Sequence, residues 1–239
     1  LGSTPAKPSA KSLSPSLKQG LVAYYPFNGN AQDESGNGNH GVIHGATLIR
    51  DRHGDLNSAF EFSGENYITV GDHAILDLGS ETERGLTISL WFYGNSTTDK
   101  CVNGIFVSKM TGKGKIASVM VDYALNLEVE DGRGLIWGTG PSDGFGGSNV
   151  TSWMFSGVTP SSKTWQHLLV SYQSSAANKL KRIFLDGALI KEAGIGTKNT
   201  ANNGPVKIGP WNGQLDDIRI YNRALSEAEV KSLYDFEKP

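Results

Sequence analysis

Short runs of alternating apolar and polar residues, each ending at a glycine-rich turn, recur along most of this chain. In LTISLWFY (residues 86–93), Ile88, Leu90 and Phe92 share one face, and the other face also carries bulk, including Trp91. A period of two is the pattern of a β-strand, and bulk on both faces indicates a central strand covered on both sides. The 30 glycines fall between such runs, where they favour tight turns.

Two Asp-Gly pairs predict β-hairpins. ALNLEVE (124–130) is followed by Asp131-Gly132 and RGLIW, and KRIFL is joined to ALIKEA by the pair at 186–187. Asp-Gly between alternating runs is a strong signal for a two-residue hairpin turn. Three further segments are expected to form strands: FEFSGENYITV (60–70, two strands around a turn at 63–66), WQHLLVSY (165–172) and QLDDIRIY (214–221).

One helix is expected, at 227–235, besides a short turn near 74–77. Ser226 and Glu229 have the spacing of a capping box, and Leu225 and Val230 that of a hydrophobic staple. Strands at regular spacing with one short C-terminal helix predict an all-β fold of two antiparallel sheets packed as a sandwich.

Composition narrows the organisation and the partners. The chain has 239 residues, a length that one large β-domain commonly fills. Residues 1–18 are rich in Ser, Pro, Lys and Ala and are expected to form a linker or tether, with the domain at 19–239. The net charge of −2 argues against nucleic acid or an anionic membrane as the main partner, and no apolar run approaches the length of a membrane span.

The near absence of cysteine suits both a bacterial exported protein and a cytosolic one. Cys101 is the single cysteine, so an intramolecular disulfide is excluded, and no signal-peptide segment is present. Because the first residue is Leu1 rather than Met, we expect the natural N-terminus to lie upstream.

Six segments, in this order, resemble the laminin G-like branch of the concanavalin A-like lectin/glucanase superfamily, as found in bacterial secreted proteins. They are LVAYYPFNGNAQDESGNGNHG (21–41), AFEFSGENYITV (59–70), LTISLWFY (86–93), WQHLLVSY (165–172), IFLDGALI (183–190) and GQLDDIRIYNRALSEAEV (213–230). The resemblance implies a jelly-roll sandwich with adjacent chain ends, in a secreted or cell-surface protein. Residues 94–164 depart from the family pattern, and such divergent loops often carry individual function.

The loop at 27–41 is a candidate calcium site. It is rich in Asn, Asp, Glu, Ser and Gly, and calcium takes six to eight oxygen ligands from such groups and from backbone carbonyls. The alternative is a turn whose side chains bond only the local backbone. Similar family members place calcium here, together with an Asp of the last strand. The resemblance therefore implies a structural calcium ion, with Asn28, Asp33, Asn39 and Asp216 as the expected ligands. Strand alternation places Asp216 on the core face, with Ile218 and Ile220.

A second candidate site lies around the glycine-rich segment 138–152, which stands with four aromatics and three short polar residues, namely Trp137, Phe145, Trp153, Phe155, Asp143, Ser148 and Asn149. Rigid aromatic faces and short polar side chains together suit sugars. The expected ligand-binding residues are Trp137, Asp143, Phe145, Asn149, Trp153 and Trp211. The alternative is that the Trp and Phe side chains belong to the core at strand ends.

Two further patterns could indicate a glycosidase or a histidine metal site, but each lacks a required feature. Glu128 and Glu130 share a strand face, but Gly132 and Arg133 stand where related sandwich glycosidases carry a third acid. The spacing of His40 and His44 suits a metal only on a helix, whereas this segment is β-like.

The leading hypothesis is therefore a non-catalytic, calcium-supported module that recognises a glycan. The alternatives are an adhesion or structural domain that binds a protein, and a glycoside hydrolase or lyase with an unrecognised site.

Overall fold

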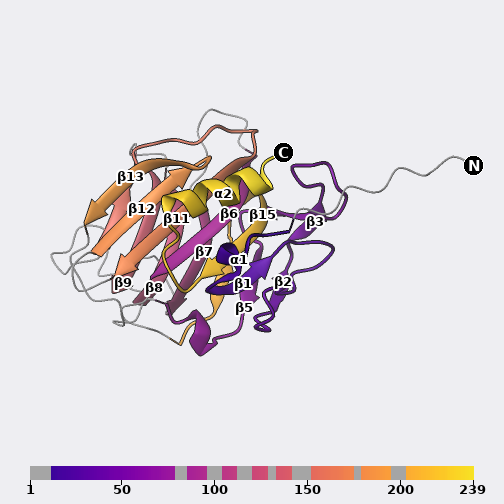
Figure 1. The fold of residues 1–239 in the computed structure, drawn as a ribbon. Coiled ribbons are helices and arrows are strands. Elements are labelled where there is room, and N and C mark those ends of the chain that lie inside the picture. The colour runs from indigo at the N-terminus through magenta and orange to yellow at the C-terminus, as the bar shows by residue number, and fades with distance from the viewer. Residues whose placement is uncertain are drawn as a thin grey trace, which may run out of the picture.

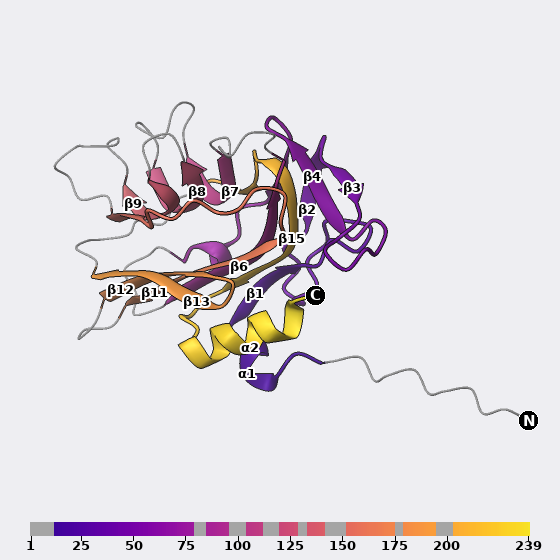
Figure 2. The ribbon, with the colours of Figure 1, turned by 90° about the horizontal axis from the view of Figure 1, so that it is seen from above.

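The computed structural model describes residues 12–78, 85–95, 104–111, 120–128, 133–141, 152–174, 179–194 and 203–239. Two antiparallel sheets face each other, and helix α2 (Glu227–Glu237) packs on the outer side of one of them (Figures 1 and 2). The predicted all-β sandwich with one short C-terminal helix is confirmed.

The sheet beneath α2, here the first sheet, has eight strands among the described residues. Seven follow the order β13-β12-β11-β6-β15-β4-β3, and β1 also pairs with β15. Their bounds are β1 Leu21–Tyr25, β3 Thr47–Ile49, β4 Ala59–Ser63, β6 Leu86–Gly94, β11 Gln166–Ser174, β12 Lys179–Leu185, β13 Ala188–Gly194 and β15 Asn212–Tyr221. The pairing of β1 with β15 brings the two ends of the domain together.

The second sheet, in the part of the chain that the structure describes, has seven strands in the order β10-β9-β8-β7-β14-β5-β2. Their bounds are β2 Gly41–His44, β5 Tyr67–Val70, β7 Gly104–Thr111, β8 Met120–Glu128, β9 Gly134–Pro141, β10 Ser152–Phe155 and β14 Val206–Ile208. The turn at 63–66 thus joins β4 of the first sheet to β5 of the second, rather than closing a hairpin.

The strands that flank both Asp-Gly pairs are joined as antiparallel hairpins. Asp186-Gly187 forms the predicted two-residue turn, whereas Asp131-Gly132 lies outside the described residues. Glu128 pairs with Gly134 where β8 meets β9, and Leu185 pairs with Ala188 where β12 meets β13. The central strand β6 is buried along almost its whole length. Its Ile88, Leu90 and Phe92 lie in the core between the sheets, whereas Trp91 faces α2 and stacks on Tyr234 with ring centroids 5.9 Å apart.

Helix α2 begins as its sequence predicts. The Ser226 hydroxyl accepts a hydrogen bond from the Glu229 amide, and the Glu229 carboxylate accepts one from the Ser226 amide. Leu225 and Val230 lie in a second apolar cluster between the helix and the first sheet. The 3-10 turn at Ala74–Leu76 is also where it was expected.

The N-terminal segment differs from the expectation where it is described. Residues Pro15–Lys18 form a four-residue helix, α1, and Leu17 is 1% exposed within the apolar cluster beneath α2. Arg223 donates hydrogen bonds to the Ser16 and Gln19 carbonyls. The domain therefore extends into the stretch that was expected to be only a linker.

Candidate functional site

The first loop is organised around the carboxylate of Asp33, which is 6% exposed. Its Oδ1 accepts hydrogen bonds from the Tyr24 and Ser35 amides at 2.9 and 2.8 Å. Its Oδ2 accepts from the Ser35 hydroxyl and the Asn39 amide, both at 2.9 Å. Burial by itself raises the pKa of Asp33, but these donors outweigh it and lower the pKa.

Asn39 is the second organiser of this loop. Its side-chain Nδ2 donates to the Val22 carbonyl, and its side-chain Oδ1 lies 2.6 Å from His73 Nδ1. Asn28 is exposed, outside this network. The loop thus has the arrangement of the alternative weighed for its sequence, in which short polar side chains bond the local backbone.

Asp216 lies elsewhere, in a charged cluster beneath α2. The Arg52 guanidinium, with a side chain 3% exposed, pairs with Asp216 and, at 2.6 Å, with Asp217. Burial and the neighbouring Asp217 raise the pKa of Asp216 well above its ordinary value, against the opposing effect of Arg52. Asp216 was expected on the core face, but it faces outward. Asp217, at a φ of 46°, interrupts the register between Asp216 and Arg219, and such a bulge shifts the alternation by one residue.

The four expected calcium ligands therefore do not form a cage. Four donors occupy the lone-pair positions of the Asp33 carboxylate, and a guanidinium neutralises Asp216. Among the described residues, no three His, Cys, Asp or Glu side chains converge in a way that would hold a metal ion. As placed, Asp33 and Asp216 are satisfied by protein groups, and calcium stays a prediction.

Of the expected ligand-binding aromatics, Trp137 and Trp211 lie in the core. Their exposed fractions are 0% and 1%; Trp211 packs on Phe106 with centroids 4.5 Å apart. A buried ring offers no face to a ligand, so the core reading applies to both residues. Asp143, Phe145 and Asn149 lie outside the described residues.

Trp153 is placed differently, half-buried on the edge strand β10. Its neighbour Met154 belongs to the core, so strand alternation directs Trp153 and Phe155 to the outer face of the second sheet. The indole lies over Gly138, its partner on β9, where a Cβ atom would be 2.3 Å from the ring. A side chain at position 138 would therefore collide with the Trp153 indole, and glycine leaves room for it.

Phe155 continues this outer face. It is 37% exposed and pairs across the strands with the buried Ile136. The Arg133 guanidinium lies 5.5 Å from the centre of the Phe155 ring. Trp153, Phe155 and Arg133, here called the β10 face, combine two aromatic rings with a cationic donor. Phe155 belonged to the aromatics of the second candidate site but not to the expected ligand-binding residues, and Arg133 was missed. The spacing of Trp153 and Phe155 could have indicated their shared face.

The charged cluster beneath α2 was also missed from the sequence, because Arg52 and Glu237 are 185 residues apart and contact through an Arg52 hydrogen bond to the Glu237 carbonyl. Trp91 Nε1 donates to Glu237 Oε2 at 3.0 Å, and Arg219 pairs with the same carboxylate. Arg219 also lies 3.8 Å above the Tyr24 ring. These contacts fix the end of α2 to the first sheet.

A serine, a histidine and a glutamate meet in this cluster without forming a catalytic triad. Ser89 Oγ lies 2.7 Å from His167 Nε2, and Glu237 Oε2 lies 3.8 Å from the same nitrogen. A triad needs the acid on the other ring nitrogen, and all three side chains are buried. Burial and the nearby Arg219 and Arg52 lower the pKa of His167 to about 3. The cluster is structural.

Comparison with solved structures shows the same fold in bacterial toxins and in a carbohydrate-active enzyme. The binding domain of Paraclostridial Mosquitocidal Protein 1 is 21% identical, with a TM-score of 0.69 over 91% of this chain and 52% of that one. A second match is a structure of botulinum neurotoxin type C, a toxin whose entry into cells depends on interaction with two ganglioside molecules. It is 14% identical, with a TM-score of 0.67 over 92% of this chain and 52% of that one. The chain thus spans about half the length of these toxin structures.

A third structure matches over nearly its whole length. It is domain 4 of AbnA, an extracellular GH43 arabinanase from Geobacillus stearothermophilus, in complex with arabinotriose. It is 20% identical, with a TM-score of 0.61 over 90% of this chain and 98% of that one. Identities this low establish the shared fold alone.

Among the helices of the described residues, none is long and apolar enough to cross a membrane. No curated protein sequence matches the chain. The family model described as the concanavalin A-like lectin/glucanases superfamily, of the laminin G type, matches residues 62–231, and the chain belongs to this family.

Proposed function

We propose that this domain is a non-catalytic module that recognises a glycan through the β10 face. The observation that carries the proposal is the pair of aromatic rings, Trp153 and Phe155, which lie two residues apart on the outer side of an edge strand. Flat apolar rings bury the apolar face of a sugar at low entropy cost, and a cationic side chain such as Arg133 donates hydrogen bonds to hydroxyls.

The fold supports this proposal. Domain 4 of the arabinanase is a separate unit of the same fold, matched over 98% of its length, and its structure holds a trisaccharide. The buried state of the Ser89, His167 and Glu237 cluster favours binding over catalysis. We infer export as well, because a module for extracellular glycans acts outside the cell, and AbnA is itself extracellular.

Binding to an array of neutral and acidic oligosaccharides tests the proposal. The protein is expected to bind a subset of sugars, and Trp153→Ala is expected to bind these sugars at least tenfold more weakly. An array on which wild type and variant behave alike would assign the domain to a protein partner or to another surface.

Calcium support remains part of this proposal and has its own test. An ion at one hundred times its dissociation constant stabilises a protein by about 2.7 kcal/mol. Binding near Asp33 and Asp216 would require their protein partners to move, so a stabilising ion would raise the melting temperature only if it displaced them. A calcium-dependent rise that Asp33→Ala abolishes supports calcium binding, and equal melting in calcium and in EDTA contradicts it.

A further inference from the structure

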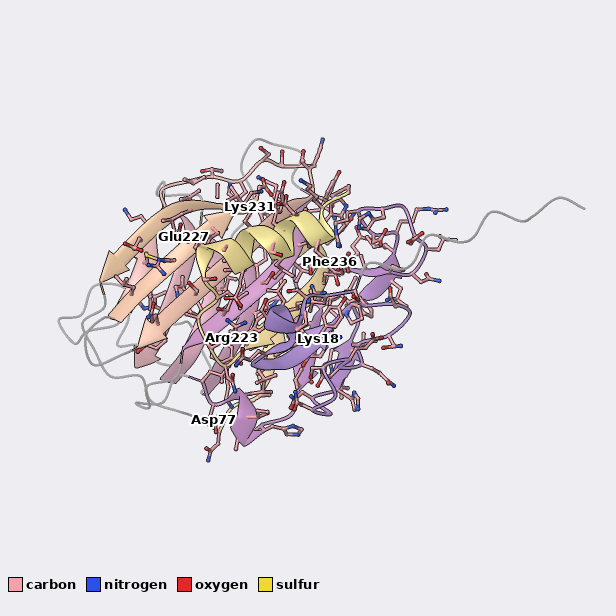
Figure 3. All side chains as sticks on the ribbon, viewed as in Figure 1. Lys18, Asp77, Arg223, Glu227, Lys231 and Phe236 are labelled. Carbon is pink, nitrogen blue, oxygen red and sulfur yellow. The ribbon has the colours of Figure 1, made fainter. Side chains whose placement is uncertain are left out.

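An open pocket of about 380 Å³ lies on the opposite side of the sandwich from the β10 face. It is bounded by α1 and its flanking residues, by β1 and β15, by the first loop and by the end of α2. Figure 3 shows Lys18 and Phe236, two of its lining residues, on the side of the molecule where the two helices lie. Its volume falls within the usual range for small-molecule sites.

One wall of this pocket, here called the helix pocket, is apolar. Leu13, Leu21 and Phe236 line it and are each only partly buried. The Tyr24 ring adds a flat surface, and its hydroxyl donates to Asp217 at 2.6 Å, which fixes the ring. The Arg219 guanidinium holds the same ring at 3.8 Å. The aromatic surface is therefore rigid before any ligand binds.

The remaining lining is polar and carries both signs of charge. Lys18 and Glu34 are exposed, so one supplies hydrogen-bond donors and the other supplies acceptors. Arg219 is 2% exposed, and its Nε donates to no acceptor among the described residues. A buried donor without an acceptor is uncommon in folded proteins and is often satisfied by water or by a ligand.

The charge balance indicates which ligand would fit. Asp217 and Glu237 already pair with Arg219, which leaves Lys18 and Glu34 as one cation and one anion. Glu34 disfavours a carboxylate or phosphate ligand, and the charged groups disfavour a purely apolar one. A neutral ring with an apolar face and several hydroxyls uses both Lys18 and Glu34.

We propose that the helix pocket is a second site, which binds one neutral sugar residue against Tyr24 and Phe236. This inference rests on the proposed function in its ligand class, but it uses different residues on the other side of the molecule. Two sites on opposite sides would allow one domain to bridge two glycan chains, which a single site on the β10 face would not.

The test is an amide NMR titration of the whole chain with arabinotriose, galactotriose and maltotriose, at millimolar concentration. At least one sugar is expected to shift the amides of Leu21, Tyr24 and Glu34. Phe236→Ala is expected to abolish these shifts, and the milder Lys18→Met to weaken the binding about tenfold. Lys231→Met, which changes an exposed lysine on α2 outside the pocket, is the matched control and is expected to bind as wild type does.

The outcomes separate the two sites. Pocket amides that stay unmoved with all three sugars overturn the second site, whatever happens at β10. Pocket shifts that persist in Trp153→Ala support an independent site, and their loss in that variant overturns it. Pocket shifts without any shift in β10 retain the helix pocket and refute the β10 face. Tighter binding of trigalacturonic acid than of the neutral sugars overturns the assignment of a neutral ligand.

Discussion

At the scale of single residues, buried charges in this domain are matched by partners from distant segments. The Lys109 ammonium, 0% exposed, contacts Asp72 at 2.5 Å, Asp77 at 3.0 Å and the Gly204 carbonyl at 2.7 Å. Arg52 joins Asp216 and Asp217 in the same manner. In both places a side-chain cation connects loops to strands, and removal of one partner would leave a buried charge.

The Asp33 carboxylate has the clearest single-residue consequence. Asp33→Ala removes the acceptor of the Tyr24, Ser35 and Asn39 amides. Unpaired buried donors are costly, so we expect urea unfolding to show a loss of about 2 kcal/mol or more. Asp51→Ala is the control, because Asp51 also accepts two amide hydrogen bonds, but at an exposed turn. An equal loss in both variants would contradict the organising role of Asp33.

His167 gives the domain a pH dependence. Its pKa is lowered to about 3 in the folded state, against about 6.5 when unfolded. Between these values the unfolded chain binds more protons, so the contribution of His167 to stability is complete above pH 6.5 and is lost as the pH falls toward 3. His167→Gln, which can keep the contact with Ser89, is expected to show a shallower decline in unfolding free energy from pH 6.5 to 4. Parallel curves for the two proteins would exclude His167 as the cause.

At the scale of elements, local sequence predicted most of what is observed. The β12–β13 hairpin and the start of α2 depend on neighbouring residues, namely Asp186-Gly187 and the Ser226–Glu229 capping box. The predicted pairing of β8 with β9 is also observed. The placement of β4 and β5 in different sheets depends on tertiary contacts, and so does the bulge at Asp217. For the same reason, strand alternation predicted the wrong face for Asp216, and the composition of residues 1–18 gave no sign that Leu17 is buried.

Helix α1 provides a test at this scale. Leu17 packs with Leu169, Phe184 and Leu233, although α1 is too short to be stable by itself. Leu17→Ala is expected to lower the unfolding free energy by about 2–5 kcal/mol. Lys18→Ala, on the adjacent exposed residue, is expected to change it by less than about 0.5 kcal/mol. A loss below 1 kcal/mol for Leu17→Ala would return residues 12–18 to the role of a tether.

At the scale of the whole molecule, the two sheets of the sandwich carry different structures on their outer sides. Helices α1 and α2 lie over the outer side of the first sheet (Figure 2). On the outer face of the second sheet, β10 carries Trp153 and Phe155. Sequence identified Trp153 as a candidate but could not separate it from Trp137. Both are tryptophans near glycine-rich turns, and only the strand register directs one inward and the other outward.

The central claim, that the β10 face binds a glycan, is tested most directly by calorimetric titration of Trp153→Ala with the tightest sugar found on the array. Trp165→Ala is the control, because Trp165 is also partly buried but packs on Tyr93, next to the first sheet. The prediction is an affinity at least tenfold lower for Trp153→Ala, about 1.4 kcal/mol, with a folded domain and with unchanged binding by the control. A folded Trp153→Ala variant that binds the sugar as tightly as wild type would contradict it.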